Sequence, residues 1–169
     1  VGISGRARVI IYNKNLASPA DLPKSVFDLK DAKWKDKIAI PSTTNSSFTA
    51  WVSSVRKLRG DAAAEDLLKA LKANDVKVLR EHTDVRKAVG AGEFALGLVN
   101  HYYYQLEKEA GSPVGVIYPD QDGGDIGVLV NSAAASIVKG APHQENARAF
   151  MKFLLSAEAQ KIFAEVNFE

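Results

Sequence analysis

Short apolar runs alternate with segments of helical periodicity along most of the chain, and this alternation constrains the fold more than any other feature. The clearest run, residues 94–99, is nearly continuously apolar, as expected of a strand in a parallel sheet that is covered on both faces. In residues 48–58 the apolar side chains recur instead at helical spacing, which predicts a helix with one face packed on a sheet. Elements that alternate in this way over short connections indicate a three-layer α/β domain around a mostly parallel sheet.

The remaining expected elements follow from the same two periodicities. Further strands are expected at residues 9–12, 37–40, 76–79 and 114–118, with two apolar pieces at 126–130 and 135–138. Further helices are expected at residues 26–29, 101–110, 146–155 and 157–166. Two more are expected to begin at a capping residue: one follows Asp61, and a short one follows Thr83 and extends through residue 89. Sheets of this kind bind ligands beyond the carboxyl ends of their strands, where helix N-termini present N–H groups. The strand-to-helix turns are therefore the places to search for a site.

The composition excludes several classes of function. Cysteine is absent, which removes disulfides and thiolate chemistry and leaves oxygen and nitrogen ligands for any metal. A net charge of +2 from 22 basic and 20 acidic residues predicts no nucleic-acid partner. No apolar run reaches the length of about 20 residues that spans a bilayer, so no membrane insertion is expected. The sequence contains no zinc-protease, phosphate-loop, nucleophile-elbow or paired-carboxylate motif, and we expect no enzyme.

The most informative segment is a string of tyrosines, Tyr102, Tyr103 and Tyr104, directly after the buried strand at 94–99. Adjacent helical residues point about 100° apart, so at most two of the rings share one direction and the third turns back to the core. A phenol ionises near pH ~10, but a trivalent cation can displace its proton, and phenolate is a hard oxygen donor suited to Fe3+. The alternative is a purely structural role, in which all three rings are packing residues.

A run of small polar residues, 42–47, lies between a predicted strand and a predicted helix. Hydroxyl and amide side chains at such a turn satisfy the N–H groups of the first helical turn, or join them in holding an anion. Helix capping explains one such residue. Six in a row indicate either an anion-binding loop or a solvated polar loop.

Other polar residues near the turns have two interpretations each. His82 precedes a predicted helix, where a lone histidine is more often a surface residue or a cap than a ligand. His101 neighbours the tyrosines but is expected to face elsewhere. Arg6 and Arg8 flank the first predicted strand, where they are either solvated or pair with a bound anion.

Taken together, these segments resemble the ferric-binding branch of the class II periplasmic solute-binding proteins. The most specific element is the Asn-x-Tyr-Tyr string after an apolar strand, Asn100 to Tyr103. The similar segments run nearly end to end: 4–9 as a first interlobe strand, 41–48 as an anion loop, 88–104 as the tyrosine motif, 128–134 as a second hinge strand, and 147–169 as late helices.

The resemblance implies a site and a role for each of its residues. Tyr102 and Tyr103 are implied to supply phenolates to Fe3+, and Tyr104 to have a packing role. The implied residues for a synergistic anion, phosphate or carbonate, are Asn45, Ser46, Ser47, Asn100, Arg8 and His82, the last at a position where family members often have asparagine.

The resemblance also implies an architecture and a transport role. It implies a three-layer α/β lobe at residues 1–127 with a first hinge strand, and at 128–169 a second hinge strand with helices of another, incomplete lobe. A strand-like run begins almost at Val1, so a fragment or processed product is expected, lacking an N-terminal part that supplies further metal ligands.

The implied function is that of a monomeric periplasmic or extracytoplasmic receptor, lipid-anchored if Gram-positive, which closes on the metal and delivers it to the permease of an ABC importer. Two alternatives share the architecture. One is a receptor for another ligand, such as a polyamine, sulfate, thiamine or phosphonate, and the other is the effector domain of a transcription regulator.

Overall fold

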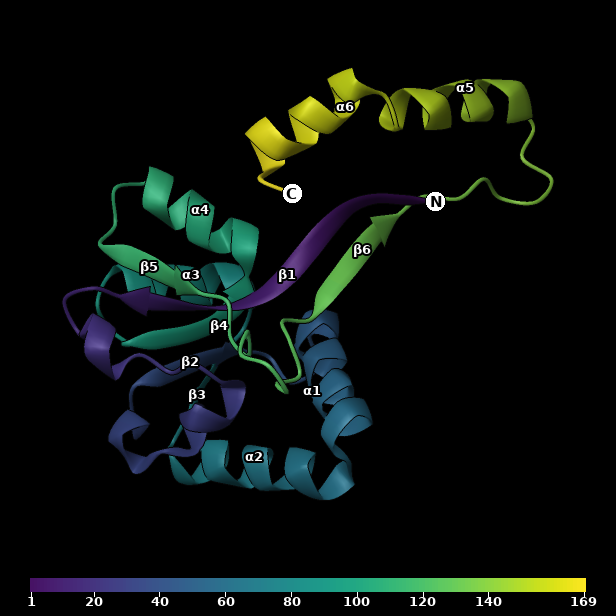
Figure 1. Ribbon diagram of the computed structural model, residues 1–169. Helices are drawn as coiled ribbons and strands as arrows, with labels where there is room; N and C mark the ends of the chain where they lie inside the picture. Colours follow the sequence, from purple (N-terminus) through teal and green to yellow (C-terminus); the bar gives the residue numbers. More distant parts are fainter. The chain divides into compact units, whose positions relative to one another are not determined.

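The computed structural model describes residues 1–169, which divide into two compact units. Unit 1 comprises Val1–Ala7 and Val130–Glu169, and unit 2 comprises Arg8–Leu129. Strand β1 (Gly2–Asn13) belongs to both, because its first half pairs within unit 1 and its second half within unit 2 (Figure 1).

Unit 2 is built on a sheet in the order β3-β2-β4-β1-β5. Its other strands are β2 (Ile38–Pro41), β3 (Lys77–Leu79), β4 (Leu96–Asn100) and β5 (Val114–Ile117). Strand β2 is parallel to β3 and β4, whereas β1 is antiparallel to both β4 and β5, so β1 alone runs against the other four. The expected mostly parallel sheet is thus present with one reversed strand. An apolar run buried on both faces has the same pattern in either direction, so its sequence does not reveal this reversal.

The helices of unit 2 cover both faces of the sheet, as the three-layer expectation requires. They are α1 (Ser46–Arg59), α2 (Asp61–Ala73), α3 (His82–Gly90) and α4 (His101–Glu109), with 3-10 turns at Pro19–Asp21, Val26–Lys30 and Ala32–Trp34. Ile10 of β1 packs in one core cluster with the apolar faces of α1 and α2. Its neighbour Ile11 points the other way, toward Val85 and Val89 of α3, because successive strand residues face opposite sides.

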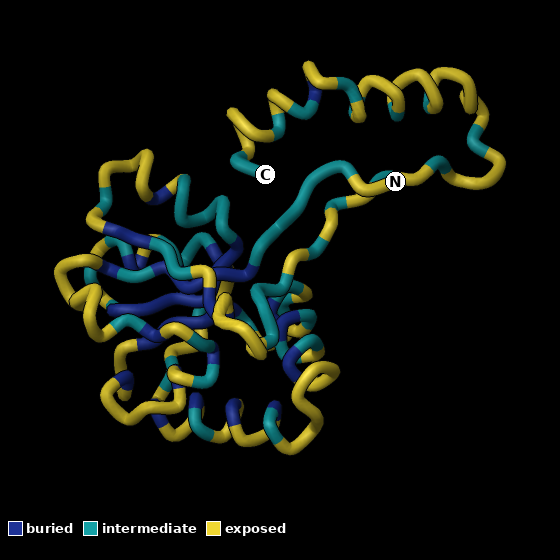
Figure 2. The backbone as a smooth tube through the Cα atoms, in the orientation of Figure 1, coloured by how far each residue is buried: buried dark blue, intermediate teal, exposed yellow.

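Unit 1 contains β6 (Val130–Ala134), α5 (Gln144–Leu154), α6 (Ala157–Ile162) and a π-helical turn at Phe163–Asn167. Strand β6 pairs antiparallel with the first half of β1, from Ala7 opposite Val130 to Gly2 opposite Ala134. The helix α5 buries none of its residues, and Figure 2 shows it largely exposed. No helix of the chain combines the length and apolar character that a bilayer crossing requires.

The start of α3 differs from the sequence-based expectation. Thr83 is not its cap, because the helix begins at His82 and its N-cap is Glu81, two positions before Thr83. The backbone N–H of Glu81 donates to the carboxylate of Asp84 at 3.0 Å, as in a capping box. His82 therefore lies in the first turn of the helix rather than before it.

Other boundaries also differ. Asp61 is the first residue of α2, and Gly60, with a φ of 89°, is the cap. Arg6 and Arg8 lie within β1 rather than beside it. Of the apolar pieces expected at 126–130 and 135–138, only Val130 lies in a strand, because the pairing with β1 selects Val130–Ala134.

Candidate anion and metal site

Three helices begin at one edge of the unit 2 sheet. The parallel strands β2, β3 and β4 have their carboxyl ends there, and α1, α3 and α4 start a few residues after them. Their N-caps are Asn45, Glu81 and Asn100. Each helix N-terminus carries partial positive charge, so this edge favours a negatively charged ligand.

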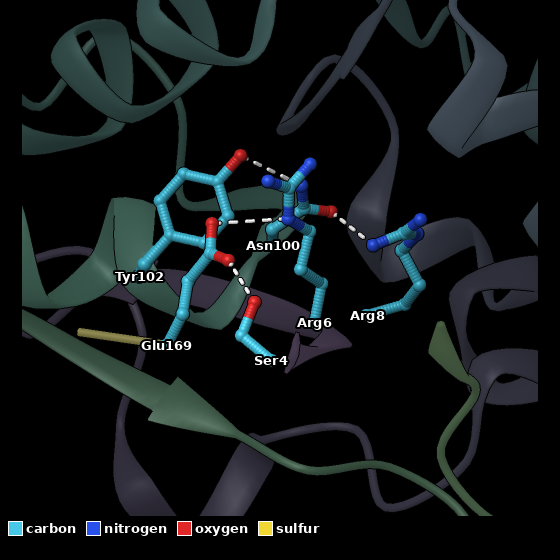
Figure 3. A network of polar contacts seen from close by, with 6 residues as sticks. All are labelled: Ser4, Arg6, Arg8, Asn100, Tyr102 and Glu169. Carbon is cyan, nitrogen blue, oxygen red and sulfur yellow. Dashed lines mark hydrogen bonds and ion pairs between the residues drawn. The ribbon is translucent and has the colours of Figure 1, made fainter. Parts of the chain in front are cut away.

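A buried guanidinium lies at the same edge because of strand register. Arg8 of β1 is opposite Asn100 of β4, and the two residues are 8% and 2% exposed. The Arg8 Nη1 donates to the Asn100 Oδ1 at 2.5 Å (Figure 3). The Arg8 Nε donates to the Ser47 carbonyl at 3.3 Å. A fixed positive charge is therefore held between α1 and the start of α4.

Asn100 also connects this charge to the tyrosines. Its Nδ2 donates to the Tyr102 hydroxyl at 3.1 Å, so its side chain serves the site rather than capping α4 (Figure 3). The Tyr102 and Tyr103 rings lie 4.4 Å apart, centroid to centroid, and both residues are half-buried. Two phenols thus lie next to each other at the edge of the sheet, beside a hydrogen-bonded cation.

Tyr103 holds its proton more tightly than an ordinary phenol. Its pKa is raised to about 12, chiefly by burial and then by the hydrogen bond and charge interaction with Tyr102, while a hydrogen bond with Thr83 opposes them. The negative charge of the Glu81 carboxylate also raises the pKa of Tyr103, by a smaller amount. At neutral pH the phenol is therefore neutral, and only a strong Lewis acid could displace its proton.

His82 completes the buried part of this site. Its ring stacks on Tyr103 at 5.2 Å between centroids, the residue is only 5% exposed, and neither ring nitrogen has a hydrogen-bond partner. The pKa of His82 is lowered to about 4, chiefly by burial and secondarily by the charge of Arg8, with a weaker opposing effect of the Leu98 backbone. The imidazole is therefore neutral at pH 7.

A small cavity lies beside these groups. Its volume is about 20 Å³, enough for one water-sized group. Arg8, Ser47 and His82 line its polar part, and the rest of its wall is apolar, including Phe48 and Trp51.

The structure brings most of the sequence-predicted residues together, but not all of them. Arg8, Ser47, His82, Asn100, Tyr102 and Tyr103 form one connected group. Asn45 is engaged elsewhere, since its Oδ1 accepts from the Ser47 backbone and its Nδ2 donates to Glu81. Ser46 is exposed in the first turn of α1.

Three neighbouring residues differ from expectation. The ring of His101 does not face away from the tyrosines but packs edge-on against Tyr102 at 5.9 Å. Arg6 belongs to unit 1, where its Nε pairs with the Glu169 carboxylate at 3.0 Å and Ser4 donates to the same carboxylate (Figure 3). Tyr104 is half-buried rather than part of the fully buried core.

Sequence reasoning missed Glu81 and the site contact of Thr83. Glu81 caps α3, accepts from Asn45 and acts on Tyr103, and the signal that could have found it is an acidic residue three positions before Asp84, a capping pattern. No cluster of three or more His, Cys, Asp or Glu side chains could hold a metal ion.

Known proteins resemble this chain over nearly its whole length. It matches the family of bacterial extracellular solute-binding proteins over residues 1–168. An Fe(3+)-binding periplasmic protein of Serratia marcescens is 32% identical over 99% of this chain and 49% of its own length. The chain spans about half the length of the curated relatives that it matches.

Solved structures agree with this assignment. Iron-bound HitA from Pseudomonas aeruginosa is 36% identical with a TM-score of 0.86, over 98% of this chain and 54% of that one. A Trichodesmium protein in complex with iron and citrate is 37% identical with a TM-score of 0.84, over 98% and 54%. The fold, the match over residues 1–168 and these relatives together show that the chain belongs to the bacterial extracellular solute-binding protein family.

Proposed function

We propose that this chain is part of an extracytoplasmic receptor that captures Fe3+ together with a small anion and delivers it to an ABC importer. The observation that carries the proposal is the pair of adjacent phenols, Tyr102 and Tyr103, beside the hydrogen-bonded Arg8 and Asn100. The names of the relatives, which include ferric iron-binding proteins, favour the same metal.

The chemistry of the two phenols suits a hard trivalent ion. Each phenol that binds Fe3+ gives up a proton and contributes one negatively charged oxygen. The high pKa of Tyr103 keeps its phenol protonated at physiological pH, so that weaker divalent cations, which displace this proton less readily, compete poorly. Two phenolates do not fill the coordination sphere of iron, and we propose that further ligands come from the anion and from elsewhere in the whole receptor.

The anion, phosphate or carbonate, is proposed to bind beside the metal at the helix N-termini. Support for its place comes from the partial positive charge of the α1, α3 and α4 N-termini and from the Arg8 guanidinium. Ser47, Asn100 and the neutral ring of His82 are the neighbouring polar groups. Asn45 and Ser46 are proposed to contribute from the rim, through the first turn of α1.

We further propose that residues 1–127 form the ligand-binding lobe and that 128–169 belong to a second lobe, with β1 and β6 as connecting strands. Iron and anion would bind to the first lobe before closure. Acid would release them, because protons compete with the metal for the phenolate and anion oxygens.

A ferric citrate titration tests the iron assignment. Phenolate bound to Fe3+ gives a charge-transfer band in the visible, which we expect in wild type and expect to be weakened or lost in Tyr102→Phe and Tyr103→Phe. Tyr118→Phe, which changes an exposed tyrosine after β5, is the matched control and should keep the full band. A wild type without the band, or double-Phe protein with an undiminished one, contradicts the assignment.

The anion is tested separately, by the same titration in phosphate, in carbonate and in a buffer without either. We expect the band maximum and the iron affinity to depend on the anion. A band that is identical in all three buffers would leave the iron assignment intact and reject phosphate and carbonate as the synergistic anion.

A further inference from the structure

Helices α3 and α4 contact each other through residues that repeat at the same spacing on both helices. His82 and Arg86 are four positions apart on α3, and Tyr103 and Glu107 are four positions apart on α4. Residues at this spacing lie on one face of a helix. His82 stacks on Tyr103, and Arg86 pairs with Glu107, so two contacts one helical turn apart join the helices.

The second contact is a shielded ion pair. The Arg86 Nη1 lies 2.5 Å from the Glu107 Oε2, and the two side chains are only 17% and 8% exposed. The other carboxylate oxygen of Glu107 accepts from the Ser112 hydroxyl at 2.7 Å. A shielded ion pair adds little net stability, because desolvation offsets the attraction, but it penalises every arrangement in which the partners separate.

Gly90 makes room for this ion pair. It lies four positions after Arg86, on the same face of α3, and a Cβ there would be 2.3 Å from the Glu107 Oε1 and 2.8 Å from its carboxyl carbon. The carboxylate has contacts on both oxygens and cannot move aside without breaking one of them. A side chain at position 90 would therefore either break one of these Glu107 contacts or push α4 away from α3.

We propose that Arg86 and Glu107 are positioning residues, which hold α4 against α3 so that the Tyr103 phenol is oriented for iron. Neither residue touches the phenol oxygens. They act by fixing how the two helices pack against each other. Glu107 lies one turn after Tyr103 on α4, and Arg86 lies one turn after His82, on whose ring Tyr103 stacks. The inference deepens the proposed iron function and rests on it for its functional consequence.

The first arm of the test needs no iron. The double variant Arg86→Met/Glu107→Gln removes both charges together, so it leaves no uncompensated buried charge and should fold. We expect the NMR ring-current shifts of the His82 ring protons to change in this variant, because the stacking of Tyr103 loosens. The single variant Arg86→Lys, which keeps a positive charge beside Glu107, should keep these shifts close to the wild-type values.

Asn74→Ala is the matched structural control. It removes a buried hydrogen bond to the Leu29 carbonyl and a part-buried one to the Asp31 carbonyl without touching α3 or α4, so it should lower stability and leave the His82 shifts unchanged. Wild-type shifts in the double variant, or an equal change in Asn74→Ala, would overturn the positioning role.

The second arm measures iron. Loss of an outer residue that orients a metal ligand typically weakens metal affinity by about 10-fold to 100-fold, and we expect that loss in the double variant together with a displaced phenolate band. Arg86→Lys and Asn74→Ala should keep the wild-type band position. Unchanged affinity and band in the double variant would refute the role in iron binding. A wild type that takes up no iron would refute the proposed function instead, and the NMR arm alone would then decide the positioning role.

Discussion

Acidification should destabilise unit 2 through the single residue His82. The ordinary pKa of histidine, 6.5, falls to about 4 in this fold, chiefly because the ring is buried and secondarily because Arg8 is near. Each unit of difference between the folded and unfolded pKa corresponds to about 1.4 kcal/mol, so the largest effect is roughly 3 kcal/mol.

The sign follows from which state binds the proton. Between pH 6.5 and about 4 the unfolded chain is protonated at His82 and the folded chain is not, so protons favour unfolding. The contribution of His82 to stability is therefore complete above pH 6.5, declines as the pH falls, and is lost below pH 4. The opposite slope, with greater stability in acid, would require a folded pKa above 6.5.

Urea denaturation at a series of pH values measures this effect. Trp34 and Trp51 are the only tryptophans and both lie in unit 2, so their fluorescence reports on that unit. The free energy of unfolding of wild type minus that of His82→Asn should fall by roughly 3 kcal/mol between pH 7 and pH 4. Parallel curves for the two proteins would refute the reasoning, as would an NMR titration of the His82 ring with a midpoint near the ordinary value.

Substitutions at three positions test the packing and capping of unit 2 by urea denaturation. Gly97→Ala should cost about 1–3 kcal/mol, because the new Cβ would lie 2.7 Å from Val85 in a tightly filled layer, and an unchanged midpoint would contradict that packing. Asn74→Ala should cost about 1–3 kcal/mol, because the buried Leu29 carbonyl loses its side-chain donor while the Asp31 carbonyl keeps only the Trp34 N–H, and a neutral result would mean that water replaces the amide. Asn45→Ala should cost about 1 kcal/mol through loss of the α1 cap, and Asn45→Asp, which keeps the acceptor, should recover most of it.

Elements with strong periodicity could be predicted from the sequence, because burial imposes the pattern. The run at 94–99 gives β4 (Leu96–Asn100), and the helical spacing at 48–58 gives α1 (Ser46–Arg59). Strand direction could not be predicted, since the β1 pattern is the same whether β1 runs with or against its neighbours. The prediction of Thr83 as the cap of α3 was wrong. Threonine is intrinsically a good cap, but the reciprocal contact of Glu81 with Asp84 starts the helix earlier.

The site was predictable where it depends on local spacing and unpredictable where it depends on tertiary register. Tyr102 and Tyr103 are adjacent in the sequence, so their closeness could be predicted directly. The contact of Arg8 with Asn100 depends on the β1–β4 register, and the stack of His82 on Tyr103 depends on how α3 packs on α4. Arg6, two residues from Arg8 in the same strand, belongs to the other unit, because β1 is shared between the two.

Anomalous diffraction at the iron absorption edge, from crystals grown with ferric iron and phosphate, tests iron capture by the phenols most directly. We expect one strong anomalous peak within bonding distance of the Tyr102 and Tyr103 hydroxyl oxygens, with an anion adjacent to it near Arg8 and Asn100. Iron bound elsewhere, or both phenol oxygens directed away from the metal, would contradict the proposed function.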